Sequence, residues 1–247
     1  MDRRRAAGTD QVTMLARARR QRMRALLVLP LLAGCRTGAE WMPAEPAAFD
    51  QLPVERTGRL GNTTELWFGH FTADSVKVSW ARGSGSGVQV GGVGGGGTES
   101  RQEYRFSLRP ADDARISVAC HSSARERNVG LRGIEMQTSA HFTYDCDIRP
   151  AIGSAWQMSV VEQGDEGFTG ALTGPATRLT LHTHLVGNRV TGRSAAAWEL
   201  RDEAGVVGSV DPRAEVVWLS QRALPAETRN AVAAAAVALL IYQRPTP

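Results

Sequence analysis

Near the C-terminus, twelve consecutive apolar residues constrain the fold more than any other feature. Residues 231–242 read AVAAAAVALLIY, so a helix built from them is apolar on every side and must be buried all round. The run is too short for a bilayer, which needs about 20 residues. Pro225 is a favourable start and Glu227 suits the first turn, so a helix is predicted over 226–243. Such a helix needs a wide β structure to enclose it.

The sequence before this helix has the pattern of an antiparallel sheet. Short β-favouring segments alternate with turn residues at about every ten positions. In Arg178–Val186, leucines occupy one face, while His182 and His184 share the other. Short connections at 187–188 and 202–205 are typical of hairpins. The pattern therefore predicts an antiparallel sheet or barrel with one buried face.

The C-terminal part also resembles a known family. Residues 197–211 read AWELRDEAGVVGSVD, Val217-Trp218-Leu219 follows, and the apolar helix comes last. These segments resemble the end of the tubby-like domains, which include plant LURP-one-related and phospholipid scramblase proteins. The resemblance implies a mainly β fold, an antiparallel β-barrel of about twelve strands enclosing the C-terminal helix. The family's phosphoinositide-binding basic residues have no counterpart here, so that function is not carried over.

At the N-terminus, residues 1–34 have the three parts of an export signal. A segment with eight Arg precedes a run of ten uncharged residues ending at Gly34, which is too short to be a permanent membrane span. Leu32-Ala33-Gly34-Cys35 resembles the lipobox of bacterial lipoproteins. That resemblance implies removal of the signal, palmitate and other acyl chains on Cys35, and a lipid anchor in the membrane. The alternative is an ordinary signal peptide with a cysteine here by chance.

The same region gives hypotheses about the start and the destination of the chain. The basic segment is long and begins with an acidic, Thr-containing stretch, so translation is predicted to start at Met14 or Met23. Arg36 stands where the family's inner-membrane retention signal has Asp, which favours the outer membrane, facing the periplasm. The whole chain has a net charge of +4 and residues 1–24 carry +6, so the rest of the chain has a net charge of 4 − 6 = −2. A domain with this charge is not expected to bind nucleic acid.

Residues 36–61 contain Pro and Gly without an apolar period, so a lipidated cysteine and flexible tether are predicted over 35–61. The β-rich domain is then expected over 62–247. Within it, the Gly-rich tract Gly83–Gly97 is predicted to be a flexible loop or hairpin tip. A formal G-x-G-x-x-G match in this tract leads into strand alternation and not into a helix, which excludes nucleotide binding.

Cys120 and Cys146 are the only cysteines left once Cys35 is lipidated. An exported protein meets an oxidising compartment, so a structural disulfide is predicted between them. It would close a loop of 27 residues, which includes the polar stretch Ser122–Asn128, a predicted long loop. The alternatives are a redox pair and two buried thiols.

His182 and His184 lie two residues apart on one strand face, a geometry that suits a bidentate metal site. A third ligand would have to come from His121, His141 or Asp145. The alternative is a pair of solvent-facing histidines opposite a leucine face.

Other polar and aromatic residues carry weaker signals. Neither G-x-S-x-G nor S-x-x-K occurs, so no nucleophile is marked. The acidic residues are interpreted as solvated turns, because the twelve-residue Ca²⁺ loop pattern is absent; they are Asp145, Asp147, Glu162, Asp165 and Glu166. Five tryptophans are predicted in the core or barrel wall: Trp67, Trp80, Trp156, Trp198 and Trp218.

Together these observations predict a membrane-anchored cell-envelope lipoprotein that is not an enzyme and needs no cofactor. Its domain is expected to be a binding or scaffold module whose partner is another envelope protein. One alternative is a carrier of a hydrophobic or lipid ligand in the barrel interior. A second is a metal-dependent hydrolase that uses His182 and His184.

Overall fold

The structure is a computed structural model that describes residues 42–58, 65–90, 93–111, 114–131, 134–162, 167–186 and 194–242. The chain divides into two units, Met1–Ala39 and Glu40–Pro247, and every described residue belongs to the second. The predicted signal peptide, the start at Met14 or Met23, and Cys35 lie outside the described residues. Among the residues described, no helix has the length and hydropathy needed to cross a bilayer.

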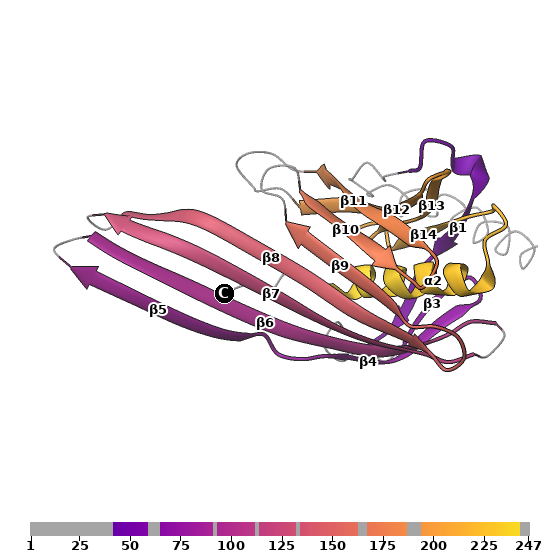
Figure 1. The fold of residues 1–247 in the computed structure, drawn as a ribbon, viewed down its shortest axis with the longest axis horizontal. Coiled ribbons are helices and arrows are strands. Elements are labelled where there is room, and N and C mark those ends of the chain that lie inside the picture. The colour runs from indigo at the N-terminus through magenta and orange to yellow at the C-terminus, as the bar shows by residue number, and fades with distance from the viewer. Residues whose placement is uncertain are drawn as a thin grey trace, which may run out of the picture. The chain divides into compact units, whose positions relative to one another are not determined.

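The described residues of the second unit form one antiparallel sheet and one long helix, with a short 3-10 helix before the first strand (Figure 1). The elements are η2 (Pro46–Ala48), β1 (Phe49–Pro53), β2 (Glu55–Thr57), β3 (Glu65–Phe68), β4 (Phe71–Val78), β5 (Arg82–Val90), β6 (Val93–Arg109), β7 (Ile116–Leu131), β8 (Ile134–Pro150), β9 (Trp156–Glu162), β10 (Phe168–Thr173), β11 (Arg178–Val186), β12 (Ser194–Asp202), β13 (Gly205–Asp211), β14 (Val216–Ser220) and α2 (Ala226–Ile241).

Residues 49–57 nearly close the sheet into a barrel. β1 pairs with β14 at one end of the sheet, and β2 pairs with β3 at the other. Val54, between them, donates its backbone N–H to the carbonyl oxygen of Glu215 at 2.8 Å. If β1 and β2 count as one wall strand and β5 is left out of the wall, the 14 strands give 14 − 2 = 12. The predicted fold class, a mainly β antiparallel barrel of about twelve strands around a C-terminal helix, is confirmed.

The predicted boundary between tether and domain at residue 62 is wrong. β1 and β2 fall inside the segment 35–61, and each residue of Phe49–Pro53 has a pairing partner in β14. Arg56 of β2 also forms an ion pair with Glu215. Backbone pairing at the barrel seam places these short strands, so their position does not depend on an apolar alternation in the sequence. The domain therefore begins no later than Phe49.

α2 lies inside the barrel, as its apolar sequence predicts. Eleven of its sixteen residues are buried, and Ala233–Ala236 are at most 1% exposed. Small side chains let the wall come close to the helix. A Cβ atom added to Gly208 of β13 would lie 2.6 Å from Cγ1 of Val232. The helix ends at Ile241, and the predicted last residue, Gln243, lies outside the described residues.

Buried aromatic side chains hold the C-terminal end of α2. The hydroxyl group of Tyr144 on β8 donates a hydrogen bond to the carbonyl oxygen of Ala238 at 2.8 Å. The same carbonyl oxygen accepts a hydrogen bond from the backbone N–H of Tyr242 at 3.1 Å, so the Tyr144 hydroxyl is a second donor to it at the helix end. The ring of Tyr242, which follows the helix, lies 4.9 Å from that of Tyr144 and 5.3 Å from that of Phe142, between centroids.

Alkaline pH is expected to destabilise the domain through Tyr144. Burial, and then its neighbours Tyr104 and Tyr242, raise the pKa of Tyr144 well above its ordinary value of 10.0. Because the folded pKa exceeds the unfolded one, the contribution of this hydroxyl is complete below the unfolded pKa. This stabilisation is lost progressively as the pH rises from the pKa of the unfolded state through the pKa of the folded state.

Urea unfolding of wild type and Tyr144→Phe at pH 8 and pH 11 measures this effect. At pH 8 the variant should be less stable by about 0.5–1.5 kcal/mol, the worth of the lost hydrogen bond. Between pH 8 and pH 11 it should lose less stability than wild type, since phenylalanine does not ionise. An equal loss in both proteins would contradict the prediction.

Strands β5 to β8 continue beyond the neighbouring wall strands as a four-stranded extension (Figure 1). β7 and β8 pair along almost their whole length, whereas β8 pairs with β9 only over 143–148. The predicted loop at Ser122–Asn128 is wrong, because these residues lie in β7. For Gly83–Gly97 the loop alternative is wrong, because its described residues form the paired strands of a hairpin, β5 and β6. Glycine and serine give no alternation of apolar and polar side chains, but the hydrogen bonds between paired strands are made by the backbone and do not require one.

Candidate functional site

The predicted metal ligands do not come together. His182 and His184 lie on β11, and β10 and β9 separate this strand from β8, which carries His141 and Asp145. Three strand steps of about 4.8 Å place them about 14 Å apart. His184 has Glu199 as its neighbour instead, with its Nε2 atom 3.3 Å from Oε2. Among the described residues, no three His, Cys, Asp or Glu side chains form a group that could hold a metal ion.

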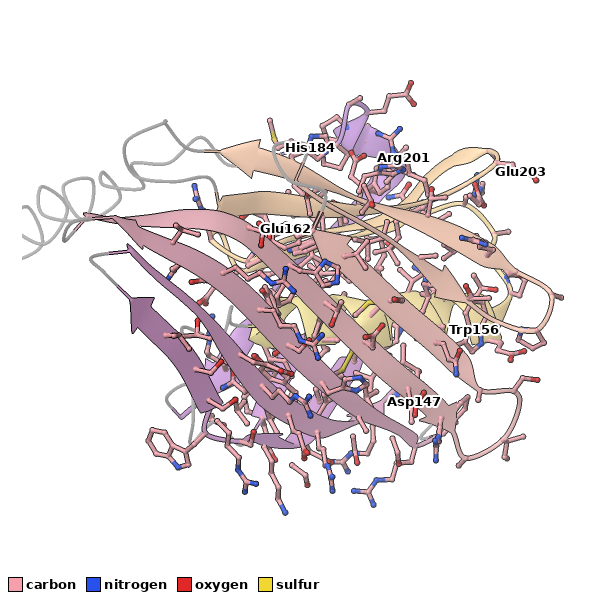
Figure 2. The ribbon with its side chains drawn as sticks, turned by 60° about the vertical axis from the view of Figure 1, so that its left-hand side comes forward. Asp147, Trp156, Glu162, His184, Arg201 and Glu203 are labelled. Carbon is pink, nitrogen blue, oxygen red and sulfur yellow. A yellow bond between two sulfur atoms is a disulfide. The ribbon has the colours of Figure 1, made fainter. Side chains whose placement is uncertain are left out.

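Glu199 is a buried carboxylate that the sequence analysis missed. It is 4% exposed and accepts a hydrogen bond from Nε of Arg201 at 2.8 Å (Figure 2 shows His184 and Arg201 on the barrel wall). Glu199 and Arg201 lie two residues apart on β12, and the strand register brings His184 of β11 beside them. Arg201 and His184 both contact Oε2 of this buried carboxylate, so the chain's own side chains occupy it. We assign this cluster a structural role.

Cys120 and Cys146 are directly opposite each other on β7 and β8, with their sulfur atoms at disulfide distance. Both are 3% exposed and belong to the hydrophobic core. A pair buried among core side chains is inaccessible to a redox partner, so this position favours a structural bridge over a redox pair.

The prediction of turns is wrong for the described acidic residues, which lie in strands. Asp145 and Asp147 lie within β8. Asp147 accepts a hydrogen bond from Arg149 at 3.1 Å, and Asp145 lies 3.7 Å from His121 on β7. Glu162 ends β9, and Asp165 and Glu166 lie outside the described residues.

The tryptophans differ in burial. Trp156, Trp198 and Trp218 are buried, at 3%, 1% and 3% exposure, and Trp67 is half-buried. The prediction is wrong for Trp80, which is 92% exposed in the break between β4 and β5.

The outer face of β4, β6, β7 and β8 contains a groove of about 410 Å³. Its floor includes the small side chains Ser107, Ser117 and Ala119, which the register places in adjacent rows on β6 and β7. Long cationic side chains surround them, so the surface is hollow there. The cationic and hydroxyl side chains that line the groove are Ser75, Lys77, Arg105, Ser107, Ser117 and Arg149.

The charges of this groove suit an acidic group. Arg105 and Arg149 have exposed acidic neighbours, Glu103 at 3.3 Å and Asp147, which also lines the groove, at 3.1 Å. Lys77, the only lysine of the chain, forms no ion pair with any described acidic residue. Exposed ion pairs contribute little and exchange easily with a partner's carboxylate. No motif marks this site in the sequence, because it depends on which residues the register places side by side.

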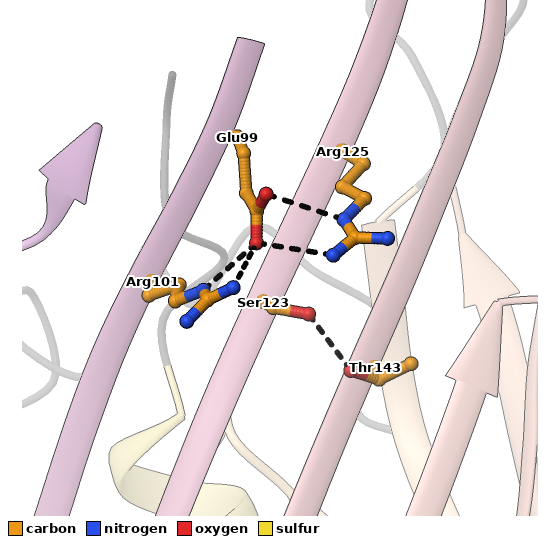
Figure 3. Close-up of polar contacts among 5 residues, drawn as sticks. All are labelled: Glu99, Arg101, Ser123, Arg125 and Thr143. Atoms are coloured by element: carbon orange, nitrogen blue, oxygen red, sulfur yellow. Dashed lines mark hydrogen bonds and ion pairs between the residues drawn. The ribbon is translucent and has the colours of Figure 1, made fainter. Parts of the chain in front are cut away.

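A second charge cluster lies further out on the extension. Glu99 of β6 accepts a hydrogen bond from Nε of Arg101 at 2.8 Å and lies 3.4 Å from Nε of Arg125 on β7 (Figure 3). The hydrogen bond from Arg101, followed by that from Arg125, lowers the pKa of Glu99. Ser123 and Thr143 add a hydrogen bond of 3.0 Å between β7 and β8. These contacts help to fix the register of the extension.

An apolar cleft of about 270 Å³ lies beside the N-terminal end of α2. Ile116, Ile148 and Trp156 are among its lining residues, and Ile152 on its edge is 86% exposed. Glu227 of α2 accepts hydrogen bonds from the backbone N–H of Ser154 at 3.2 Å and from Nε1 of Trp156 at 3.3 Å. The carboxylate thus ties the loop after β8 to the first turn of the helix.

Comparison with known proteins gives no relative: the chain matches no family model, no curated protein and no solved structure. Its function must therefore be argued from its own residues.

Proposed function

We propose that this chain is an exported lipoprotein, held in the outer membrane through acyl chains on Cys35, and that its barrel is a non-enzymatic binding or scaffold module facing the periplasm. One observation carries the binding role. α2 occupies the barrel interior with buried side chains, so a partner must be met on the outside of the barrel. The twelve wall strands around a helix are the architecture that the tubby-like resemblance implies.

Two further features support this proposal. The opposed cysteines Cys120 and Cys146 suit an oxidising compartment outside the cytoplasm. The outer groove supplies Lys77, Arg105 and Arg149, which fit acidic side chains of an envelope protein. The partner is therefore expected to present carboxylate groups to the face formed by β4, β6, β7 and β8.

Replacing Cys35 tests the anchor. Wild-type protein from fractionated cells should be in the membrane fraction, begin at Cys35 and carry the mass of acyl chains. Cys35→Ala should lose the acyl mass and leave the membrane fraction, because acyl chains are the proposed attachment. Thr37→Ala, a change of similar size two residues away, serves as the matched control and should behave as wild type. Unmodified wild-type protein, or acylated Cys35→Ala, would refute the anchor.

The apolar cleft beside α2 favours a second candidate function, a carrier of a small hydrophobic ligand. Such a ligand would enter at the helix N-terminus, beside Ile152, and not fill the barrel interior. The two candidates give different native mass spectra of the same membrane-extracted protein. The binding module should show the acylated chain alone, whereas the carrier should retain an apolar small molecule.

A further inference from the structure

β5 leaves one edge of the sheet open. On one side, β6 pairs with β7. On its other side, β6 pairs with β5 over residues 93–101 and with β4 over residues 104–109, and residues 79–81 form the break between β4 and β5. β5 pairs with β6 at all nine of its residues, Arg82–Val90. Within the part of the chain that the structure describes, no strand pairs with its other edge. Figure 1 shows β5 as the outermost strand of the extension.

After Arg82, its first residue, this edge lacks the features that usually block strand addition. β5 contains no proline and no lysine, and no register shift interrupts its pairing with β6. Residues 82–88 are exposed, and from Gly83 to Gly87 the side chains are only those of glycine and serine. The backbone N–H and C=O groups along this edge can therefore be reached by another strand.

Two large exposed apolar side chains lie at equal distances along the chain from Ser84, Trp80 in the break before β5 and Val88 within β5. Trp80 is 92% exposed and Val88 is 72% exposed, four residues before and four residues after Ser84. When two identical strands pair antiparallel about Ser84, the Trp80 end of one copy meets the Val88 end of the other. We propose that β5 pairs with β5 of a second copy of this chain about a two-fold axis at Ser84.

The charges along the strand agree with this register. Arg82 is the only charged residue of β5, and in the proposed pair it lies opposite Ser86 of the second copy. The two Arg82 residues are then four positions apart along the strands, about 13 Å, which exceeds the Debye length of about 8 Å at physiological salt. No like charges face each other.

The antiparallel direction also keeps the barrels apart. β5 begins beside the barrel and ends at the far end of the extension (Figure 1), so each barrel lies at the opposite end of the shared sheet. The glycine and serine side chains offer a foreign peptide no pockets for selection, whereas the paired Trp80 and Val88 ends complement an identical strand. One strand pair is smaller than a permanent dimer interface, so the association should be reversible.

Cysteine cross-linking of the purified full chain tests the register. Ser84→Cys should form a disulfide-linked dimer on mild oxidation, because directly opposite strand residues lie within disulfide reach. Arg82→Cys and Ser86→Cys should each stay monomeric alone but cross-link to each other when mixed. Wild type, with its own three cysteines, is the control for background cross-linking. The test is repeated on a Cys35→Ala background, so its outcome is independent of the lipid anchor.

A second measurement examines the apolar ends of the strand. Trp80→Ser/Val88→Ser should weaken self-association in sedimentation experiments at least tenfold, as expected when two large apolar side chains stay in water. Both residues are exposed, so the unfolding temperature of the variant should match that of wild type. A monomeric wild type at high concentration together with no Ser84→Cys dimer would overturn the proposal. Cross-linking of Ser84→Cys to a different protein would also overturn it.

Discussion

Replacing Gly170 by alanine is expected to destabilise the domain by about 3 kcal/mol or more. Gly170 lies in β10 opposite Val160 of β9. A Cβ atom at this position would lie 2.1 Å from the backbone carbonyl oxygen of Ser159 and 3.0 Å from Cα of Val160. Both contacts are with backbone, so no side-chain rotation can relieve them. The paired strands must move apart, which disrupts their hydrogen bonds in the barrel wall.

Urea unfolding of the purified protein measures this loss. Gly95→Ala is the matched control, because it makes the same change in a strand where an added Cβ atom meets nothing within 4 Å. It should stay within about 1 kcal/mol of wild type, since glycine to alanine in an open strand position costs little. Similar stability of the two variants would show that β9 and β10 are not packed as described.

Much of the fold could be predicted because burial leaves a periodic signal. The apolar run 231–242 predicted a helix buried on all sides, and the alternation in Arg178–Val186 predicted the strand β11. The extension could not be predicted, since Gly83–Gly97 has few side chains to form a period. β1 and β2 were missed for another reason: β1 pairs with β14, more than 150 positions away in the chain, and Arg56 of β2 contacts Glu215, 159 positions away.

The candidate site was less predictable, because it depends on strand register. His182 and His184 do share a strand, but the proposed third ligands lie on strands that are not its neighbours. The outer groove forms where Ser117 and Ala119 meet the long side chains of Arg105 and Arg149, residues from three strands. A single sequence cannot show such lateral neighbours, whereas two cysteines in an exported chain limit the possible pairing at once.

That cysteine pair gives the second large prediction: breaking the link between Cys120 and Cys146 is expected to lower stability by about 3–4 kcal/mol. The two residues are 26 positions apart in the chain, so a bridge between them restricts a long segment of the unfolded chain. In the folded state they already face each other across β7 and β8, both in the core. Reduction should therefore act mainly by giving the unfolded chain more freedom.

Urea unfolding with and without a reducing agent separates this effect from core packing. Wild type should lose about 3–4 kcal/mol on reduction, a large share of the 5–15 kcal/mol typical of a domain. Cys120→Ala/Cys146→Ala should be insensitive to the reducing agent and no more stable than reduced wild type, since it also leaves a small cavity in the core. If reduction leaves wild type unchanged, the cysteines are two buried thiols, and the argument from them for an oxidising compartment fails.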